Sequence, residues 1–195
     1  MNLTGHRAME HTLQSIRSLV PLSADTERAL RDCLVSCRFA KKHLLVEEGR
    51  RAGAAYFIER GITRSYWLVN GEEITTSFMA EGGMVFSMDE LYYDRPSEEY
   101  VETLEETTAC RIDLNDLRRL FETNLELANW GRIIHQNEYR RLHRSHKERL
   151  TLSAAERYEA FCRQFPQVVQ RVQLGYIASY LGITLPTLSR LRGRR

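Results

Sequence analysis

The sequence lacks the features that mark secreted, membrane-spanning and disulfide-stabilised proteins. Four cysteines among 195 residues are too few and too scattered for a disulfide framework. No run of about 18 apolar residues is present to span a membrane, and the N-terminal residues have no signal-peptide apolar core. We therefore expect a cytoplasmic protein with reduced thiols and no membrane partner.

Catalytic and cofactor motifs are also missing. The sequence has no Gly-x-Ser-x-Gly elbow, no Gly-x-x-x-x-Gly-Lys phosphate loop and no His-Glu-x-x-His zinc motif. Cys33 and Cys37 are one helical turn apart, the spacing of a metal or redox half-site, but two ligands without a nearby second pair are weak evidence, and a packed or partly exposed pair is the favoured alternative. An iron–sulfur cluster needs four gathered thiolates, and His43, alone between residues 12 and 134, is weak evidence for haem. We expect no enzyme activity, no metal and no cofactor.

Charge is distributed unevenly along the chain, although the net charge is only +2. Residues 132–195 hold 13 Lys/Arg against 4 Asp/Glu, a net charge of +9, whereas the rest of the chain has a net charge of −7. A basic segment of this kind is attracted to the phosphate backbone of nucleic acids. The charge of this segment therefore indicates double-stranded DNA as a partner.

Residues 174–192 have the spacing of a DNA-binding helix-turn-helix. Ala178 is small where two helices must cross, and Gly182 falls four residues later at a turn that requires a positive φ. The second helix would begin at Thr184, whose hydroxyl can cap it, with Pro186 in its first turn. Hydroxyls suit phosphate, and arginine suits phosphate or guanine. The residues expected to contact DNA are Thr184, Thr187, Ser189, Arg190, Arg192, Arg194 and Arg195. An ordinary helical hairpin is the alternative interpretation.

The first half of the chain is typical of a β-sandwich or roll. A helix with Ser23 as its cap is expected over residues 23–34. Asn70-Gly71 between two alternating runs predicts a hairpin turn with positive φ at both central residues. The strands expected from the alternating runs are 43–46, 54–58, 62–69, 72–79, 100–104 and 108–112.

After Asp113 the hydrophobic period changes from 2 to 3.6. Helices are expected over 114–121 and 125–142, the second capped by Asn124. An apolar stripe on this helix packs either on its own β-domain or on a second copy. We favour a parallel dimer, because a single helix-turn-helix gains affinity and half-site reading by dimerising. The stripe residues expected at the dimer contact are Leu127, Trp130, Ile133, Ile134 and Asn137.

The remaining segment connects this helix to the helix-turn-helix. A hinge is expected around residues 151–153, followed by a helix over 154–165 that Pro166 ends. Residues 168–172 are expected to be a short extended stretch.

The order of these parts resembles the bacterial Crp/Fnr-type transcription regulators over nearly the whole chain. The matching motifs are Phe57-Ile-Glu-Arg-Gly61 followed by Arg64, the Asn70-Gly71 hairpin, Phe78 before Glu81-Gly-Gly83, and residues 177–184 leading into 187–190. The resemblance implies an α+β chain. Its parts are a cyclic-nucleotide-binding-like β-roll or jelly roll (1–123), a long dimerisation helix (124–149) and a winged helix-turn-helix (150–195), with any wing coming from 168–172. It also implies a homodimer that binds a two-fold related promoter site and contacts RNA polymerase.

The segment that holds the ligand in cyclic AMP-binding members departs from their pattern. Those members have a Gly-Glu-Leu segment for the ribose and an Arg for the phosphate. Here Asp89-Glu90-Leu91 stands for the first, and Glu98, Glu99 or Tyr100 occupies the place of the Arg. Residues 72–106 hold 11 acidic residues and one basic residue, so an anion would be repelled. The candidate effector-pocket residues are Gly82, Gly83, Asp89, Glu90, Leu91, Glu99 and Tyr100.

The effector is therefore expected to differ from cyclic AMP. An uncharged, cationic or apolar effector, a protein partner, or no ligand at all are open alternatives. Leu185 and Pro186 occupy positions where related regulators often have Arg and Glu, so the preferred DNA sequence should differ from theirs. The sequence predicts a homodimeric, sequence-specific DNA-binding transcription regulator. The alternative is an effector-binding or protein-interaction module whose C-terminal helices dock to a protein.

Overall fold

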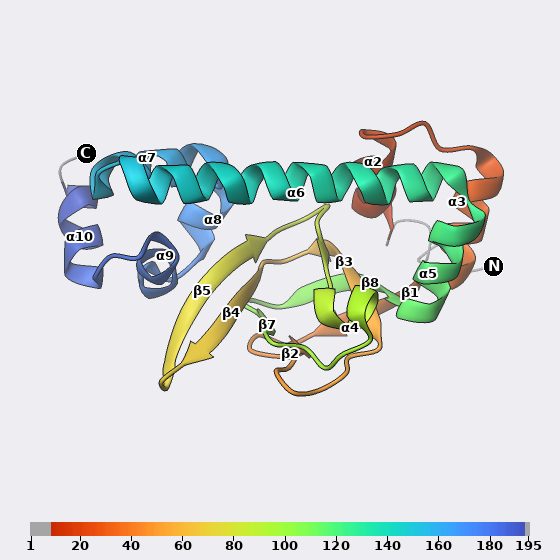
Figure 1. Ribbon diagram of the computed structural model, residues 1–195, viewed down its shortest axis with the longest axis horizontal. Helices are drawn as coiled ribbons and strands as arrows, with labels where there is room; N and C mark the ends of the chain where they lie inside the picture. The colour runs from red at the N-terminus through yellow and green to blue at the C-terminus, as the bar shows by residue number, and fades with distance from the viewer. Residues whose placement is uncertain (1–8, 194–195) are drawn as a thin grey trace.

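A computed structural model describes residues 9–193 of the chain. A β-sandwich lies beneath one long helix, and short helices gather at the far end of that helix (Figure 1). No helix in residues 9–193 is both long and apolar enough to cross a membrane.

Two helices precede the sandwich. Helix α3 (Ala24–Cys33) is the predicted one, and the Ser23 side chain accepts the N–H of Thr26 as its cap. Helix α2 (Glu10–Arg17) was not predicted. Its N-terminal end is satisfied from a distance, because the Glu59 carboxylate accepts the backbone N–H groups of His11 and Thr12 at 3.0 and 2.9 Å. A cap supplied by a residue 47 positions away leaves no local sequence signal.

The sandwich consists of two antiparallel four-stranded sheets, with strand orders β1-β8-β3-β6 and β2-β7-β4-β5. The strands are β1 (Val35–Phe39), β2 (Leu44–Val46), β3 (Ala54–Arg60), β4 (Thr63–Val69), β5 (Glu72–Met79), β6 (Met84–Val85), β7 (Tyr100–Thr103) and β8 (Thr107–Asp113). All six predicted strands are confirmed. The predicted hairpin turn is confirmed too, since Asn70 and Gly71 have φ values of 53° and 84°.

Three short elements of this domain were missed. They are β1, β6 and helix α4 (Met88–Tyr93), which is capped by Ser87. Strand β1 also changes the expected spacing of Cys33 and Cys37. Cys33 ends helix α3 and Cys37 lies in β1, so the two are not one helical turn apart, and both are free thiols. Among residues 9–193, no three His, Cys, Asp or Glu side chains are placed to hold a metal ion.

The two helices after the sandwich form where the period change predicted them. They are α5 (Leu114–Thr123) and α6 (Leu125–Thr151), and the Asn124 side chain accepts the N–H of Leu127 at 3.1 Å as the predicted cap. Helix α6 has 27 residues and extends nine residues past its expected end. Charged side chains fill its last turns, so the apolar period fades before the helix does.

The apolar stripe of α6 packs on its own β-domain, which corrects the predicted dimer contact. Leu127 and Trp130 are 1% and 4% exposed in a core shared with Phe57 and Cys110, and Ile133 and Ile134 pack against that core. Asn137 is exposed but lies apart from it. Leu127 and Trp130 therefore bury their surface within the chain, and Ile133 and Ile134 bury part of theirs there.

The C-terminal part is helical throughout its described residues. Its helices are α7 (Ala154–Gln164), α8 (Pro166–Arg171), α9 (Leu174–Leu181) and α10 (Leu185–Gly193). Ser153 and Glu156 form a capping box at the start of α7, where the hinge was predicted. Residues 168–172 fall mostly in α8, so the extended stretch was wrong. Since no strand lies between residues 152 and 193, this part of the chain has no wing. Pro166 both ends α7 and opens α8, because its missing N–H costs nothing at a first helical position.

Candidate nucleic-acid interface

Helices α9 and α10 form the predicted helix-turn-helix. Gly182 ends α9 with φ 64° and ψ 39°, the left-handed conformation that the turn requires. Ala178 is 3% exposed, and its carbonyl accepts the N–H of Ile183 at 3.0 Å across the turn. Leu188 of α10 is fully buried against α7 and α9. The turn and crossing residues therefore act as their spacing predicted.

The candidate DNA-contacting side chains lie on the surface of α10. Thr184, Ser189, Arg190 and Arg192 are exposed, and Thr187 is half-buried. The Thr184 hydroxyl accepts the N–H of Thr187 at 3.4 Å, as expected of a cap. Arg194 and Arg195 lie outside the described residues. The structure thus brings five of the seven candidates together, four on α10 and Thr184 directly before it.

The arginines of α10 are not paired with acids. Arg190 donates to the carbonyl of Pro186 and to the hydroxyl of Thr187, at 3.4 and 3.3 Å. Neither Arg190 nor Arg192 forms an ion pair with a carboxylate among residues 9–193. An exposed guanidinium without a carboxylate is available to a phosphate or to a guanine edge.

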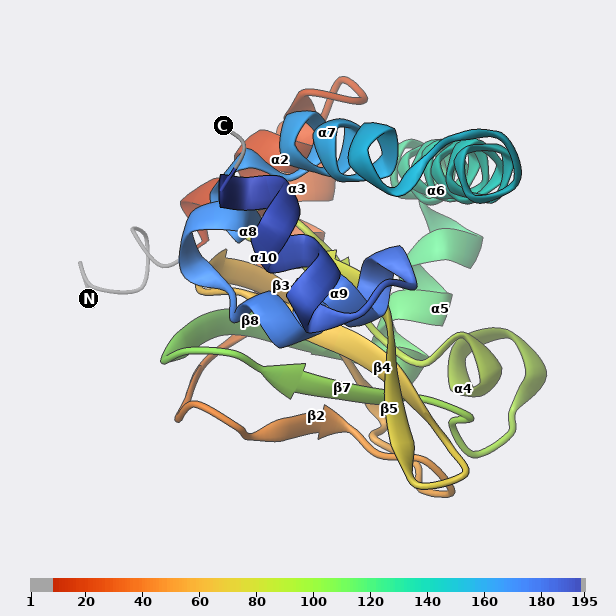
Figure 2. The ribbon, with the colours of Figure 1, turned by 90° about the vertical axis from the view of Figure 1, so that its left-hand side faces the viewer.

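The helix-turn-helix rests on the β-sandwich with its flanking helices, called the sensor domain below by analogy with the family it resembles, through helix α9, which lies against strand β5 (Figure 2). The apolar part of this contact is aromatic: Phe78 of β5 packs on Phe161, Phe165 and Tyr180. Sequence reasoning missed this contact because nothing in the spacing of either segment refers to the other.

An ion-pair cluster borders the same contact. Arg171 of α8 donates to Glu81 at 2.8 and 3.0 Å and also contacts Glu105. Burial opposes ionisation of Glu81, but Arg171 and backbone N–H groups outweigh it and lower the pKa of this carboxyl to about 2. Residues of the β5–β6 and β7–β8 turns thus bind the C-terminal helices.

The candidate effector residues do not gather in one pocket. Gly82 and Gly83 form the turn between β5 and β6, and Gly82 faces Ser15 of α2. Leu91 is 4% exposed in the core beneath α6. Glu90 is also 4% exposed, and its carboxylate accepts the N–H groups of Ala52 and Gly53 at 2.9 and 2.7 Å. Buried and already bonded, Glu90 is not available to a ribose, which corrects its predicted role.

Two candidates, Glu99 just before β7 and Tyr100 at its start, have different surroundings. Glu99 is largely buried, and this burial, together with the charge of Asp89, raises the pKa of its carboxyl to about 7. Tyr100 instead stacks on Tyr66 of β4, with ring centroids 5.0 Å apart. Because Val101 points into the sandwich core, alternation along β7 places Tyr100 on the outer face, whereas Glu99 lies in the bend before the strand. Asp89 and Glu99 are therefore the pair that the structure does bring together.

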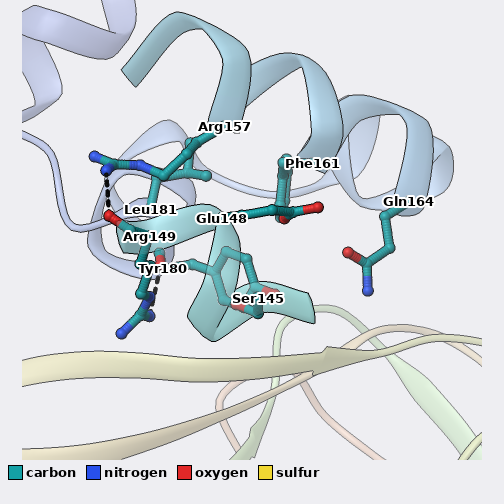
Figure 3. Close-up of a pocket in the computed structure, with 8 residues that line it drawn as sticks. All are labelled: Ser145, Glu148, Arg149, Arg157, Phe161, Gln164, Tyr180 and Leu181. Atoms are coloured by element: carbon teal, nitrogen blue, oxygen red, sulfur yellow. Dashed lines mark hydrogen bonds between the residues drawn. The ribbon is translucent and has the colours of Figure 1, made fainter. Parts of the chain in front are cut away.

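Two hollows are formed by other residues. A cavity of about 20 Å³ lies where α6, α7 and α9 meet, and Arg149 there donates to the carbonyl of Tyr180 at 3.1 Å (Figure 3). This space suits one water molecule and no larger ligand. Its lining residues are Ser145, Glu148, Arg149, Arg157, Phe161, Gln164, Tyr180 and Leu181.

The second hollow is an open groove of about 390 Å³ between α4, α5 and α6. Across it the hydroxyl of Tyr92 lies 3.0 Å from Nε2 of His135. The groove is lined by Met88, Tyr92, Tyr93, Phe121, Ala128, Gly131, Arg132 and His135. None of these residues belongs to the predicted effector set.

Known proteins share this arrangement. Residues 36–124 match the family model of the cyclic nucleotide-binding domain. No curated protein is significantly similar in sequence. Among solved structures, the c-di-GMP-responsive global regulator CLP of Xanthomonas campestris has 18% identity and a TM-score of 0.66, with 88% of this chain and 91% of that chain covered.

Two further structures extend the likeness. FixK2 from Bradyrhizobium japonicum has 18% identity and a TM-score of 0.72, with 83% of each chain covered. A transcriptional regulator assigned to the Crp/Fnr family from Eubacterium rectale has 14% identity and a TM-score of 0.68, with 87% of this chain and 82% of that chain covered. The likeness extends over most of each chain and is one of fold.

Proposed function

The chain has the fold of the Crp/Fnr-type transcription regulators, and on this premise we propose that it is a homodimeric regulator that binds a specific DNA sequence through helix α10. Its sensor domain responds to an effector other than cyclic AMP, if it binds one. Contact with RNA polymerase is the further expectation that the resemblance carries.

The observation that carries the proposal is the surface of α10. Its Ser189 hydroxyl and two guanidinium groups are exposed together within the net +9 segment, and neither guanidinium has a carboxylate partner among the described residues. A recognition helix with free Arg side chains can enter a major groove, where bidentate pairing with guanine discriminates between bases.

The direct test selects bound duplexes from a random pool and then measures the affinity of the selected duplex. Arg190→Ala should weaken that specific binding by about 1–3 kcal/mol if the guanidinium contacts a base. Arg163→Ala is a matched control, because Arg163 is also exposed but lies on α7 beside Glu159. Equal affinity of the Arg190 variant and the unmodified chain would show that α10 does not bind in the groove as proposed.

The alternative function, protein docking by the C-terminal helices, makes the opposite prediction at low salt. A protein-docking module should not bind random duplex, whereas a DNA-binding segment should bind it weakly, with an affinity that falls as salt is added. The salt dependence of fluorescence anisotropy with labelled random duplex distinguishes the two.

A different face of α6 from the predicted one supports dimerisation. Leu125, Tyr139, Leu142 and Leu150 are 83%, 72%, 51% and 73% exposed. Of these, Leu125, Tyr139 and Leu142 follow a seven-residue period with Ala128 and His135 along one side of the helix, as a parallel coiled coil requires, and Leu150 lies one residue past that register. We therefore assign the dimer contact to this side in place of the stripe that begins at Leu127.

Sedimentation of two single variants tests the reassigned face. Leu142→Glu places a charge in the proposed seam and should shift the chain to monomer. Asn137→Glu introduces the same charge on the other side of α6, within the stripe first predicted, and should leave the dimer intact. The reverse outcome would restore the original stripe.

The charge and bonding of the sensor domain support the exclusion of cyclic AMP. Tyr100 stands at one of the positions considered for the phosphate-binding Arg, and it stacks on Tyr66 instead of facing the interior. Calorimetric titration with cyclic AMP should therefore give no heat of binding. Saturable binding would contradict this part of the proposal.

A further inference from the structure

A guanidinium sandwiched between two tyrosine rings connects the sensor domain to the helix-turn-helix. The Arg64 side chain on β4 is 1% exposed. Its Cζ lies 4.1 Å from the ring centre of Tyr66 on the same strand and 3.9 Å from the ring centre of Tyr176 on α9. Cation–π contacts of this kind strengthen when the cation is desolvated.

Carboxylates on the sensor side hold this guanidinium in place. Arg64 pairs with Glu102 of β7 at 2.6 Å and with Glu73 of β5 at 2.5 Å. Glu102 also binds Lys42 at 3.0 Å, and the Lys42 ammonium in turn reaches the hydroxyl of Tyr176. Arg64 of β4 and Lys42 of the β1–β2 turn therefore both contact Tyr176 of α9, and strands β5 and β7 supply the carboxylates that hold them.

A second set of directional bonds lies one turn further along α9. The Ser179 hydroxyl accepts the backbone N–H of Thr75 at 2.9 Å and donates to the carbonyl of Glu73 at 3.0 Å. Strand β5 is an edge strand that neighbours only β4. Ser179 bonds two backbone groups of β5 that β4 leaves unpaired. These bonds fix the rotation of α9 on the sheet, which aromatic packing alone leaves adjustable.

Docking leaves the DNA-facing surface open. Thr184, Ser189, Arg190 and Arg192 remain exposed while Tyr176 and Ser179 are engaged. The contact is therefore compatible with DNA binding and does not mask the recognition helix.

We propose that Arg64 and Tyr176 form a joint that fixes the orientation of the helix-turn-helix on the sensor domain, so that the two copies of α10 in a dimer are preset to meet successive grooves of the duplex. The proposal rests on the proposed DNA-binding function and adds the residues that position it. Tyr176 is a positioning residue, since it acts on DNA only through the placement of α10.

The test compares Tyr176→Leu with Tyr176→Phe. The leucine variant removes the ring above Arg64, whereas the phenylalanine variant keeps the ring and loses only the hydroxyl contact with Lys42. Amide exchange at Thr75 reports the joint directly, because its N–H is bonded to Ser179 across the contact. Exchange at this amide should be at least about 10-fold faster in Tyr176→Leu and close to that of the unmodified chain in Tyr176→Phe.

Affinity for the selected duplex is the second readout. Tyr176→Leu should bind about 3- to 30-fold more weakly, the range expected from loss of a desolvated cation–π contact. Ser179→Ala removes the second set of bonds with a small change in volume, and should weaken duplex binding in the same direction even if the leucine variant does not fold. Unchanged or tighter duplex binding by folded Tyr176→Leu and by Ser179→Ala would overturn the joint.

The two proposals fail in different ways. If the unmodified chain binds no duplex in dilute buffer, the DNA-binding function is wrong, whatever Thr75 shows. If the unmodified chain binds its duplex and Tyr176→Leu matches it in both affinity and Thr75 exchange, the joint alone is wrong.

Discussion

Arginines in the two halves of this molecule have opposite surroundings. Arg64 in the sensor domain is buried, with two carboxylates and two aromatic rings around it. Arg190 and Arg192 on α10 are exposed, with no acid beside them in the described part of the chain. A guanidinium that is paired with carboxylates within the fold maintains structure, whereas one without an acid partner at the surface is available to a ligand.

The carboxylates show the same contrast within the sensor domain. Glu90 and Glu102 are bound by backbone N–H groups or by cations of the chain itself. Glu99 differs, because its burial and the negative charge of Asp89 both disfavour the ionised form of its carboxyl. The two fully buried carboxylates of residues 72–106 are therefore bonded within the fold, whereas the carboxyl of Glu99 has its pKa raised.

Arg64→Met should cause the largest loss of stability among the variants that test this comparison. Removing the guanidinium leaves Glu102 buried with only Lys42, and loss of one partner of a buried ion pair costs about 3–5 kcal/mol. The free energy of unfolding in urea measures the effect. Arg38→Met is the matched control, because the Arg38–Glu106 pair is exposed on both sides and should contribute less than about 1 kcal/mol. Equal losses in the two variants would mean that burial does not distinguish these arginines.

Glu99→Gln should abolish one part of the pH dependence of stability. The pKa of this carboxyl is raised to about 7 in the folded chain, so between about pH 4.5 and 7 the unfolded chain loses its proton first. Stability should therefore fall as pH rises through this window, by up to about 3 kcal/mol. The glutamine variant should be flatter with pH and more stable than the unmodified chain at pH 8, as urea unfolding at pH 5 and 8 would show. Parallel curves for the two chains would contradict the assignment.

Gly182→Ala should weaken the helix-turn-helix alone. Its φ of 64° is unfavourable for a residue with a Cβ, although no atom within 4 Å would meet that Cβ. The cost should be about 1–2 kcal/mol of backbone strain. Gly175→Ala, seven residues earlier and equally open, lies within α9 and should stabilise it by up to about 1 kcal/mol. Thermal unfolding of both variants checks that their effects have opposite signs.

Arg192→Ala should have the smallest effect on folding. An exposed arginine without an acid partner contributes within about 0.5 kcal/mol to stability. The same change should reduce the slope of log affinity against log salt by about 1, if the guanidinium contacts a phosphate. Duplex titrations at several salt concentrations measure that slope, and a changed melting temperature with an unchanged slope would reverse the interpretation.

Local patterns predicted the elements that depend on neighbouring residues. The Asn70-Gly71 turn, the Asn124 cap and the Gly182 turn are each determined within about four residues, and each is confirmed. The order of these elements sufficed to recognise the fold that solved structures share with the chain. For the same reason the exposed hydroxyls and arginines of α10 were found from sequence.

Features that depend on distant residues could not be predicted. The cap of α2 comes from Glu59, and the partner of Tyr176 is Arg64, more than a hundred residues away. The stripe beginning at Leu127 was assigned to the wrong neighbour, because helical period identifies an apolar face without identifying what covers it. The effector residues were misplaced for a similar reason, since Glu90 satisfies backbone groups of a loop nearly forty residues earlier.

Helix α6 connects the β-sandwich to the C-terminal helices and contacts both. With 27 residues it is about 40 Å long, its first turns clamped by Leu127 and Trp130 and its last turns touching α9 through Arg149. A tilt of only about 5° at the clamped end displaces the other end of such a rod by about 3.5 Å. That displacement exceeds the length of a hydrogen bond, so under the proposed function a slight repacking beneath Trp130 would move an arginine of α10 out of reach of a base.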